Sequence, residues 1–125
     1  MAKTSFTAAY RIGTVETELG DFANEVAGYE ALHRLLSNAC ELQGMEQIQL
    51  IAEATGGYEA ALLAYAYAQG WGVSMPNPLR VRQWAQGVGY RVKTDRVDAR
   101  ILAHYGTDCR PPLRPQLAVE VTEMD

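Results

Sequence analysis

The sequence predicts an α/β fold in a single domain. Its 125 residues suffice for one hydrophobic core. Strand and helix patterns alternate after residue 45, which favours a sheet with parallel members. Two strand-like segments before the first helix favour a hairpin beside that sheet.

The N-terminal part is expected to form this hairpin and then a helix. Apolar residues alternate with more polar ones in the first strand, at Phe6, Ala8, Tyr10 and Ile12. Gly13 breaks the pattern, and TVETELGDFAN is the second, poorer strand. Asn24 is expected to cap a helix from about Val26 to Leu42. Its apolar face consists of Tyr29, Leu32, Leu35 and Leu36.

The middle of the chain alternates strand and helix. QIQLIAE reads as a short buried strand that ends at Glu53, and TGG as a turn. YEAALLAYAYAQG predicts an alanine-rich helix closed by Gly70, and WGVSM another strand. Asn77 is expected to cap the next helix, with Pro78 at its first position. The side chains of that helix expected to point toward the core are Val81, Trp84 and Ala85.

The last predicted helix carries most of the chemistry considered below. Thr94 is a suitable N-cap for a helix from Asp95 to about Tyr105, and Gly106 is expected to end it. Three prolines then precede a segment without periodicity. We therefore expect a domain over residues 1–110 and a linker or disordered tail over 111–125.

Charge is distributed unevenly along the chain. The net charge is −4, yet residues 1–79 carry −6 and residues 80–114 carry +5. This uneven charge argues against a protein that coats nucleic acid non-specifically. It allows a strip of basic side chains along one edge of a binding site. The alternative is a solvated helix surface. No apolar run is long enough for a membrane span and no secretory signal is visible, while two distant cysteines favour a reducing, cytoplasmic setting.

Asp95 and Asp98 are the first candidate site residues. On a helix, residues three apart share a face, with Cβ atoms about 5–6 Å apart. Two such carboxylates repel unless a cation compensates them, and Mg²⁺ binds through one or two carboxylates together with substrate phosphates. The alternative is that they complement the helix dipole and pair with Arg96 and Arg100.

Glu53 adds a third carboxylate at a revealing position. It ends a predicted strand and precedes a sharp turn, and ligands of open α/β sheets bind beyond the carboxyl ends of strands. The alternative is a strand-end charge that simply meets solvent. The TGG turn matches neither phosphate-binding loop motif, so it does not indicate nucleotide binding.

Three motifs resemble one family closely. They are E-A-T-G-G-Y from residue 53, N-P-x-x-V-R-x-W-A from residue 77, and K-T-D-x-x-D-A-x-x-L-A from residue 93. Together they resemble the N-terminal catalytic domain of the DEDD transposases of the insertion sequence 110 group, related to the Piv-type DNA invertases. The resemblance is dense over residues 53–106 and looser over the preceding hairpin and helix.

The resemblance implies a fold and a metal site. The fold would be ribonuclease H-like, of the RuvC kind, with a mixed sheet and flanking helices. Four acidic residues of the family hold divalent metal, Mg²⁺ or Mn²⁺, and the motif places Glu53, Asp95 and Asp98 as the last three. The family's first aspartate lies on the opening strand, in a motif whose end matches Ala2-Lys3. That aspartate is not in this sequence.

This departure leads to two expectations. The sheet would lack its first, central strand, which leaves neighbouring strand edges open to self-association or substitution. Without one bridging carboxylate, metal binding and catalysis would be severely weakened. The family's C-terminal half, which supplies the proposed serine nucleophile, also lies outside this chain. We therefore expect the chain to be inactive by itself.

The resemblance also implies partners. The intact protein would cut and join DNA during transposition, in the bacterial cytoplasm at the nucleoid, as a homo-oligomer and with an element-encoded guide RNA. Basic side chains would line the approach of nucleic-acid phosphates, namely Arg80, Arg82, Lys93, Arg96 and Arg100. The alternative is a non-catalytic remnant that binds nucleic acid or another protein.

Overall fold

The computed structural model describes residues 4–53, 57–90 and 95–116, without the side chains of residues 95–97. Its elements in chain order are β1 (Ser5–Ile12), β2 (Val15–Ala23), α1 (Val26–Gln43), β3 (Gln49–Ile51), α2 (Ala60–Ala68), β4 (Gly72–Ser74), α3 (Pro78–Val88) and α4 (Asp95–Cys109). The predicted order of strands and helices is confirmed, as is the α/β class.

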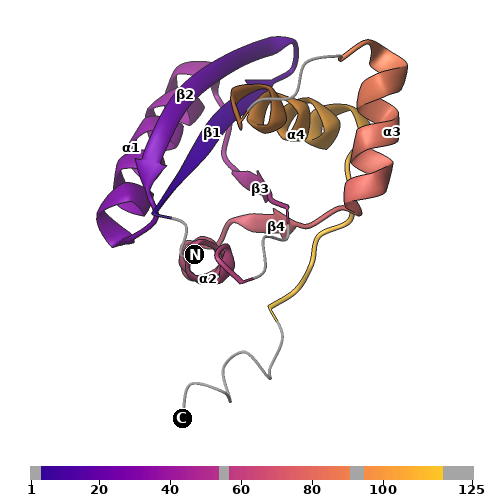
Figure 1. The fold of residues 1–125 in the computed structure, drawn as a ribbon. Helices are drawn as coiled ribbons and strands as arrows, with labels where there is room; N and C mark the ends of the chain where they lie inside the picture. The colour runs from indigo at the N-terminus through magenta and orange to yellow at the C-terminus, as the bar shows by residue number, and fades with distance from the viewer. Residues whose placement is uncertain (1–3, 54–56, 91–94, 117–125) are drawn as a thin grey trace.

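The strands of the described residues form two separate two-stranded sheets rather than one mixed sheet (Figure 1). β1 and β2 are antiparallel, from the pair Ser5–Ala23 to the pair Ile12–Val15, with a bulge between Ala8 and Ala9. β3 and β4 are parallel. Each of β1 and β3 therefore has one strand neighbour and one edge to which no described strand is bonded.

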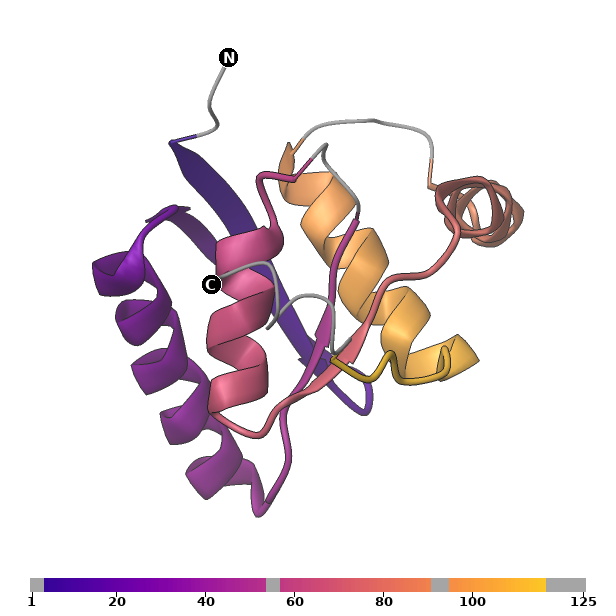
Figure 2. The same ribbon diagram turned by 90° about the horizontal axis from the view of Figure 1, so that it is seen from below.

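The helices cover the strands from two sides. Seen from below, α1 and α2 lie on one side of the strands and α4 on the other (Figure 2). α4 packs against β1 and β2, and α3 packs against α4. The main core cluster lies between α2 and the parallel pair and consists of Ala52, Leu63, Ala66, Trp71 and Val73. No helix among the described residues is both long and apolar enough to cross a membrane.

Two details of α1 differ from expectation. The helix begins after Glu25, and no side chain caps it. Asn24 instead accepts a hydrogen bond from the hydroxyl of Tyr29 and donates one to the carbonyl of Tyr58. The prediction of an Asn24 cap is wrong because this side chain ties α1 to the segment before α2. Leu35 is also exposed rather than buried, whereas Tyr29 is buried as predicted.

Gly106 lies inside α4 instead of ending it. A Cβ added at Gly106 would lie 2.7 Å from Cγ1 of Ile51, so the missing side chain permits close contact with β3. The helix continues to Cys109 because this packing outweighs the weak helix propensity of glycine. The Asn77 cap is confirmed, since its side chain accepts from the backbone N–H of Leu79 at 2.8 Å. Thr94 lies outside the described residues.

The residues just after α4 are ordered against β4. Ser74 is fully buried, and its hydroxyl lies within hydrogen-bond distance of the carbonyls of Pro111, at 3.2 Å, and Pro112, at 2.9 Å. The backbone N–H of Arg114 donates to the carbonyl of Val73 at 2.6 Å. The first residues of the expected tail thus form a strap along β4, while residues 117–125 lie outside the described part.

Candidate nucleic-acid and metal site

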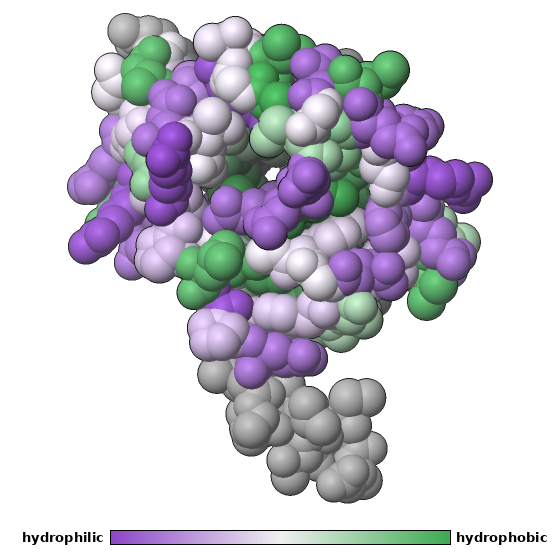
Figure 3. Space-filling model, turned by 180° about the vertical axis from the view of Figure 1, so that it is seen from behind, coloured by the Kyte–Doolittle hydropathy of each residue, from purple (hydrophilic) through white to green (hydrophobic). Residues whose placement is uncertain are grey.

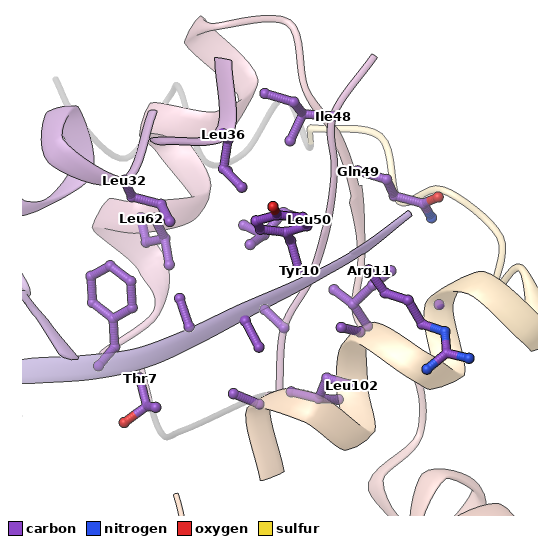
Figure 4. Close-up of a pocket in the computed structure, with 18 of the residues that line it drawn as sticks. Thr7, Tyr10, Arg11, Leu32, Leu36, Ile48, Gln49, Leu50, Leu62 and Leu102 are labelled. Atoms are coloured by element: carbon purple, nitrogen blue, oxygen red, sulfur yellow. The ribbon is translucent and has the colours of Figure 1, made fainter. Parts of the chain in front are cut away.

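A large cavity opens between the two sheets. Its volume is about 840 Å³, and its walls come from β1, α1, α2, α4 and the segment that contains β3. Figure 4 shows apolar side chains from several of these elements turned toward it. From behind, the molecular surface is hollowed near its centre (Figure 3). The cavity therefore sits where the open edges of β1 and β3 face the interior.

Two of the predicted carboxylates line this cavity. Glu53 follows β3, and Asp98 lies in the first turns of α4. They come from segments 45 residues apart in the sequence, and the fold brings both to one cavity. Carboxylate oxygens are the ligands that Mg²⁺ and Mn²⁺ prefer. The chemistry of this pair therefore fits a divalent cation, although the described residues contain no group of three His, Cys, Asp or Glu close enough to hold one.

The remaining predicted residues near this site are described only in part. Asp95 begins α4, three residues before Asp98, and its side chain lies outside the described set, as does that of Arg96. Lys93 lies in the segment 91–94, which is also outside it. The helix backbone does confirm the premise that Asp95 and Asp98 belong to one helix. Whether their carboxylates act together stays a prediction.

The predicted phosphate-contacting arginines fall into two environments. Arg80 and Arg82 are exposed on α3, and no described carboxylate forms an ion pair with either. Arg100 instead reaches the hairpin, where its Nε lies 2.6 Å from Oε2 of Glu16 and its Nη1 lies 3.4 Å from Glu18. Its side chain remains 40% exposed. Arg100 is therefore engaged in holding α4, whereas the α3 arginines are available to a ligand.

Glu16 is the residue whose importance the sequence did not reveal. Its carboxylate also accepts from Nη1 of Arg11 at 3.0 Å. Burial of Glu16 would by itself raise the pKa of its carboxyl, but the hydrogen bonds and charges of Arg100 and Arg11 outweigh burial and lower the pKa. The hydrogen bond to Glu16 correspondingly raises the pKa of Arg100. This network fixes α4, and with it Asp98, against the hairpin.

A second polar cluster joins the end of α3 to α4. The hydroxyl of Tyr90 lies 2.9 Å from Nδ1 of His104, and Nε2 of His104 lies 3.1 Å from Asp108. Trp84 packs edge-on against His104, with ring centroids 4.8 Å apart. Burial is the main cause that raises the pKa of the Tyr90 hydroxyl, and the negative charge of Glu16 is the next largest. His104 lines none of the cavity, so its partners and position indicate a role in packing α3 on α4.

Comparison with known proteins points to one family. Residues 1–121 match the family model of the DEDD transposases of the insertion sequence 110 group. The description of that family is transposase. The pilin gene-inverting protein of Moraxella lacunata is 44% identical over 66 residues, and that of Moraxella bovis is equally similar. The matched segment covers 53% of this chain and 20% of each relative, so the chain corresponds to a small part of those proteins.

Proposed function

Because the chain belongs to the DEDD transposase family of the insertion sequence 110 group, we propose that it is part of a DNA recombinase that cleaves and joins DNA strands with divalent metal. The observation that carries the proposal is the convergence of Glu53 and Asp98 on one cavity. The pilin gene-inverting relatives support a role in DNA rearrangement.

In this proposal Glu53, Asp95 and Asp98 hold Mg²⁺ or Mn²⁺ through their oxygen atoms. The metal would supply charge stabilisation at the scissile phosphate. The chain's own contribution is positional: Glu53 follows the end of β3, and the Glu16–Arg100 pair holds α4 so that Asp98 lines the same cavity. A RuvC-like arrangement of the strands belongs to the same proposal, supported by the hairpin, helix, strand, helix, strand order.

DNA is the proposed substrate, and the exposed Arg80 and Arg82 would contact its phosphates. A guide RNA and a homo-oligomer belong to the proposal for the intact protein, through the resemblance of the three motifs. We propose that these 125 residues by themselves do not cleave DNA, because by the motif match they carry three of the family's four metal-binding carboxylates, Glu53, Asp95 and Asp98.

The test is incubation of the purified chain with supercoiled plasmid in the presence of Mg²⁺ or Mn²⁺. The plasmid is expected to remain intact. Robust metal-dependent cleavage that disappears in Asp95→Ala and in Asp98→Ala would overturn the proposed inactivity and at the same time support the metal site. Cleavage that persists in both variants would indicate a contaminant or a different site.

A non-catalytic nucleic-acid-binding role is the second candidate, favoured by the exposed arginines of α3. Phosphate contacts by such side chains give salt-sensitive binding that does not need metal. Binding to duplex DNA that survives Asp95→Ala and Asp98→Ala would support this role. Absence of any DNA or RNA binding at low salt would exclude it.

A further inference from the structure

We propose that one side of α1 is a surface through which two copies of this chain associate, with their α1 helices packed antiparallel about a two-fold axis. The residues of this surface, named the α1 stripe, are Ala31, Arg34, Leu35, Asn38, Glu41 and Leu42. The inference gives the proposed homo-oligomer a surface, and it depends on neither the metal site nor DNA.

The α1 stripe exposes two leucines. Leu35 is 43% exposed and Leu42 is 85% exposed. Seven residues make almost two full turns, so both side chains lie on nearly the same side of the helix. Tyr29 and Leu32 belong to the buried face of α1. The two leucines therefore extend the apolar surface of the helix beyond the part that the described fold covers.

The spacing of the stripe is that of a helix that packs against another helix. Its apolar members and Asn38 follow one another at intervals of four, three and four residues, at positions 31, 35, 38 and 42. This is the a/d repeat of a seam between two helices, in which a single asparagine can fix the register. All four positions lie within α1, whose 18 residues span about 27 Å. Figure 2 shows α1 at the edge of the molecule, with α2 on its inner side.

The stripe is complementary to itself about Asn38. If a two-fold axis passes beside this residue and the helices run antiparallel, Leu35 lies opposite Leu42 of the second copy. Their heights along the helix then differ by one residue, or about 1.5 Å. The leucine contact occurs twice, once on each side of the axis, as in any isologous interface. The two Asn38 side chains meet at the axis, where each amide offers both a donor and an acceptor.

The flanking charges select the antiparallel arrangement. Arg34 and Glu41 are exposed, lie seven residues apart and follow one side of the leucines. In the antiparallel arrangement Arg34 faces Glu41 of the second copy, and this contact of opposite charges also occurs twice. In a parallel arrangement each residue would stand level with its own copy, and such juxtaposed like charges are unfavourable. A helix that carries both signs at these matched positions thus fits a second copy of itself.

The association is expected to be weak. A surface confined to one helix is smaller than the interfaces of stable complexes, which bury roughly 1,200–2,000 Å² in total. Exposed ion pairs add little to affinity and act mainly on orientation and register. A dissociation constant of roughly 10–500 µM is therefore expected.

Sedimentation equilibrium of the purified 125-residue chain at low salt tests the surface, at concentrations from about 10 µM to 2 mM. The natural chain is expected to pass reversibly from monomer to dimer over this range. Leu42→Gln removes an apolar side chain from the seam and is expected to weaken association at least about tenfold. Val26→Gln is the matched control, because Val26 is 62% exposed on the other side of the same helix. That control should associate like the natural chain, and circular dichroism verifies that both variants fold.

Reversal of the flanking charges tests the orientation. Arg34→Glu and Glu41→Arg each place like charges opposite one another at two points of the dimer. Each is expected to weaken association about tenfold. The double variant restores opposite charges at both points, so its dissociation constant should return to within about threefold of that of the natural chain. High salt should reduce these differences, because exposed charges are screened.

Three results would overturn the proposal. One is a chain that stays monomeric at every concentration up to about 2 mM. Another is association that Leu42→Gln leaves unchanged, because the contact would then lie on a different surface, such as a strand edge. The third is a double charge variant that associates as weakly as the single ones, which would exclude the antiparallel pairing. The measurements contain neither metal nor DNA, so failure here leaves the proposed recombinase role untouched.

Discussion

The carboxylate of Glu16 accepts a hydrogen bond of 2.6 Å from the guanidinium of Arg100, 84 residues further along the chain. This contact joins the turn end of the hairpin to the helix that carries Asp98. Its geometry is that of a charge-assisted hydrogen bond, and Arg11 donates a second hydrogen bond to the other oxygen of the same carboxylate. The position of one candidate metal ligand thus depends on a pair that touches no metal.

Glu16→Gln is expected to destabilise the chain by about 1–3 kcal/mol, because it removes the charge from two hydrogen bonds with arginine. Urea unfolding measures the change. Glu41→Gln, at an exposed position on α1, is the control and should change the unfolding free energy by less than about 0.5 kcal/mol. Equal effects of the two substitutions would show that the Glu16 network contributes nothing specific.

The lowered pKa of Glu16 predicts an acid-sensitive stability. A carboxyl whose pKa is lower in the folded than in the unfolded chain contributes stability above its unfolded pKa. That contribution is lost as the pH falls through the folded pKa. The unfolding free energy of the natural chain should therefore decline below about pH 4.5 more steeply than that of Glu16→Gln. Parallel pH profiles for the two proteins would contradict the assignment.

Gly106→Ala is expected to destabilise the chain by about 1–3 kcal/mol through overpacking against Ile51. Gly87→Ala is the matched control, since it lies in helix α3 with nothing within 4 Å of an added Cβ. That control should stabilise the chain by about 0.5–1 kcal/mol through helix propensity. Thermal unfolding distinguishes the two, and stabilisation by both would mean that α4 and β3 are not in close contact.

Ser74→Ala tests the strap that follows α4. The substitution removes a hydroxyl that accepts a hydrogen bond from Gln49 and shares its single hydrogen between the carbonyls of Pro111 and Pro112. A loss of about 1–3 kcal/mol is expected in urea unfolding. Ser37→Ala, on the exposed face of α1, should have little effect. If truncation after residue 110 matched the natural chain in stability, the strap would be dispensable.

Arg80→Ala together with Arg82→Ala is expected to weaken DNA binding similarly for unrelated sequences. The double variant should reduce the slope of log affinity against log salt by about two, one for each phosphate contact. Arg34→Ala, at an exposed position on α1, provides the control. An unchanged slope measured by fluorescence anisotropy would place the phosphate contacts elsewhere.

Local patterns predicted the elements, while long-range contacts decided the exceptions. The alternation around Tyr10 and the Asn77-Pro78 pair depend on neighbouring residues, and both predictions held. Asn24 failed as a cap because Tyr58, 34 residues away, provides a competing partner. Gly106 failed as a helix stop because Ile51 needs the space, which no local pattern reveals.

At the candidate site, too, the sequence motifs predicted some residues and long-range contacts determined the others. The motifs indicated Glu53 and Asp98 as site residues, and the fold brings both to one cavity. The role of Glu16 was not visible, because its charge looked like any other in a strand with a solvent-exposed face. Only the crossing of α4 over the hairpin makes it the partner of Arg100. The cavity lies between two sheets whose facing edges no described strand joins, and the sequence indicated such open edges only through the family resemblance rather than through local patterning.

The most direct test of the metal site is titration of the chain with Mn²⁺ while NMR line broadening is recorded at each residue. The account predicts that broadening begins at Glu53 and at the residues around Asp98, and that Asp98→Asn removes it at both places. Glu41→Gln should leave it unchanged. Broadening centred elsewhere, or unaffected by Asp98→Asn, would contradict the claim that Glu53 and Asp98 form one divalent-cation site.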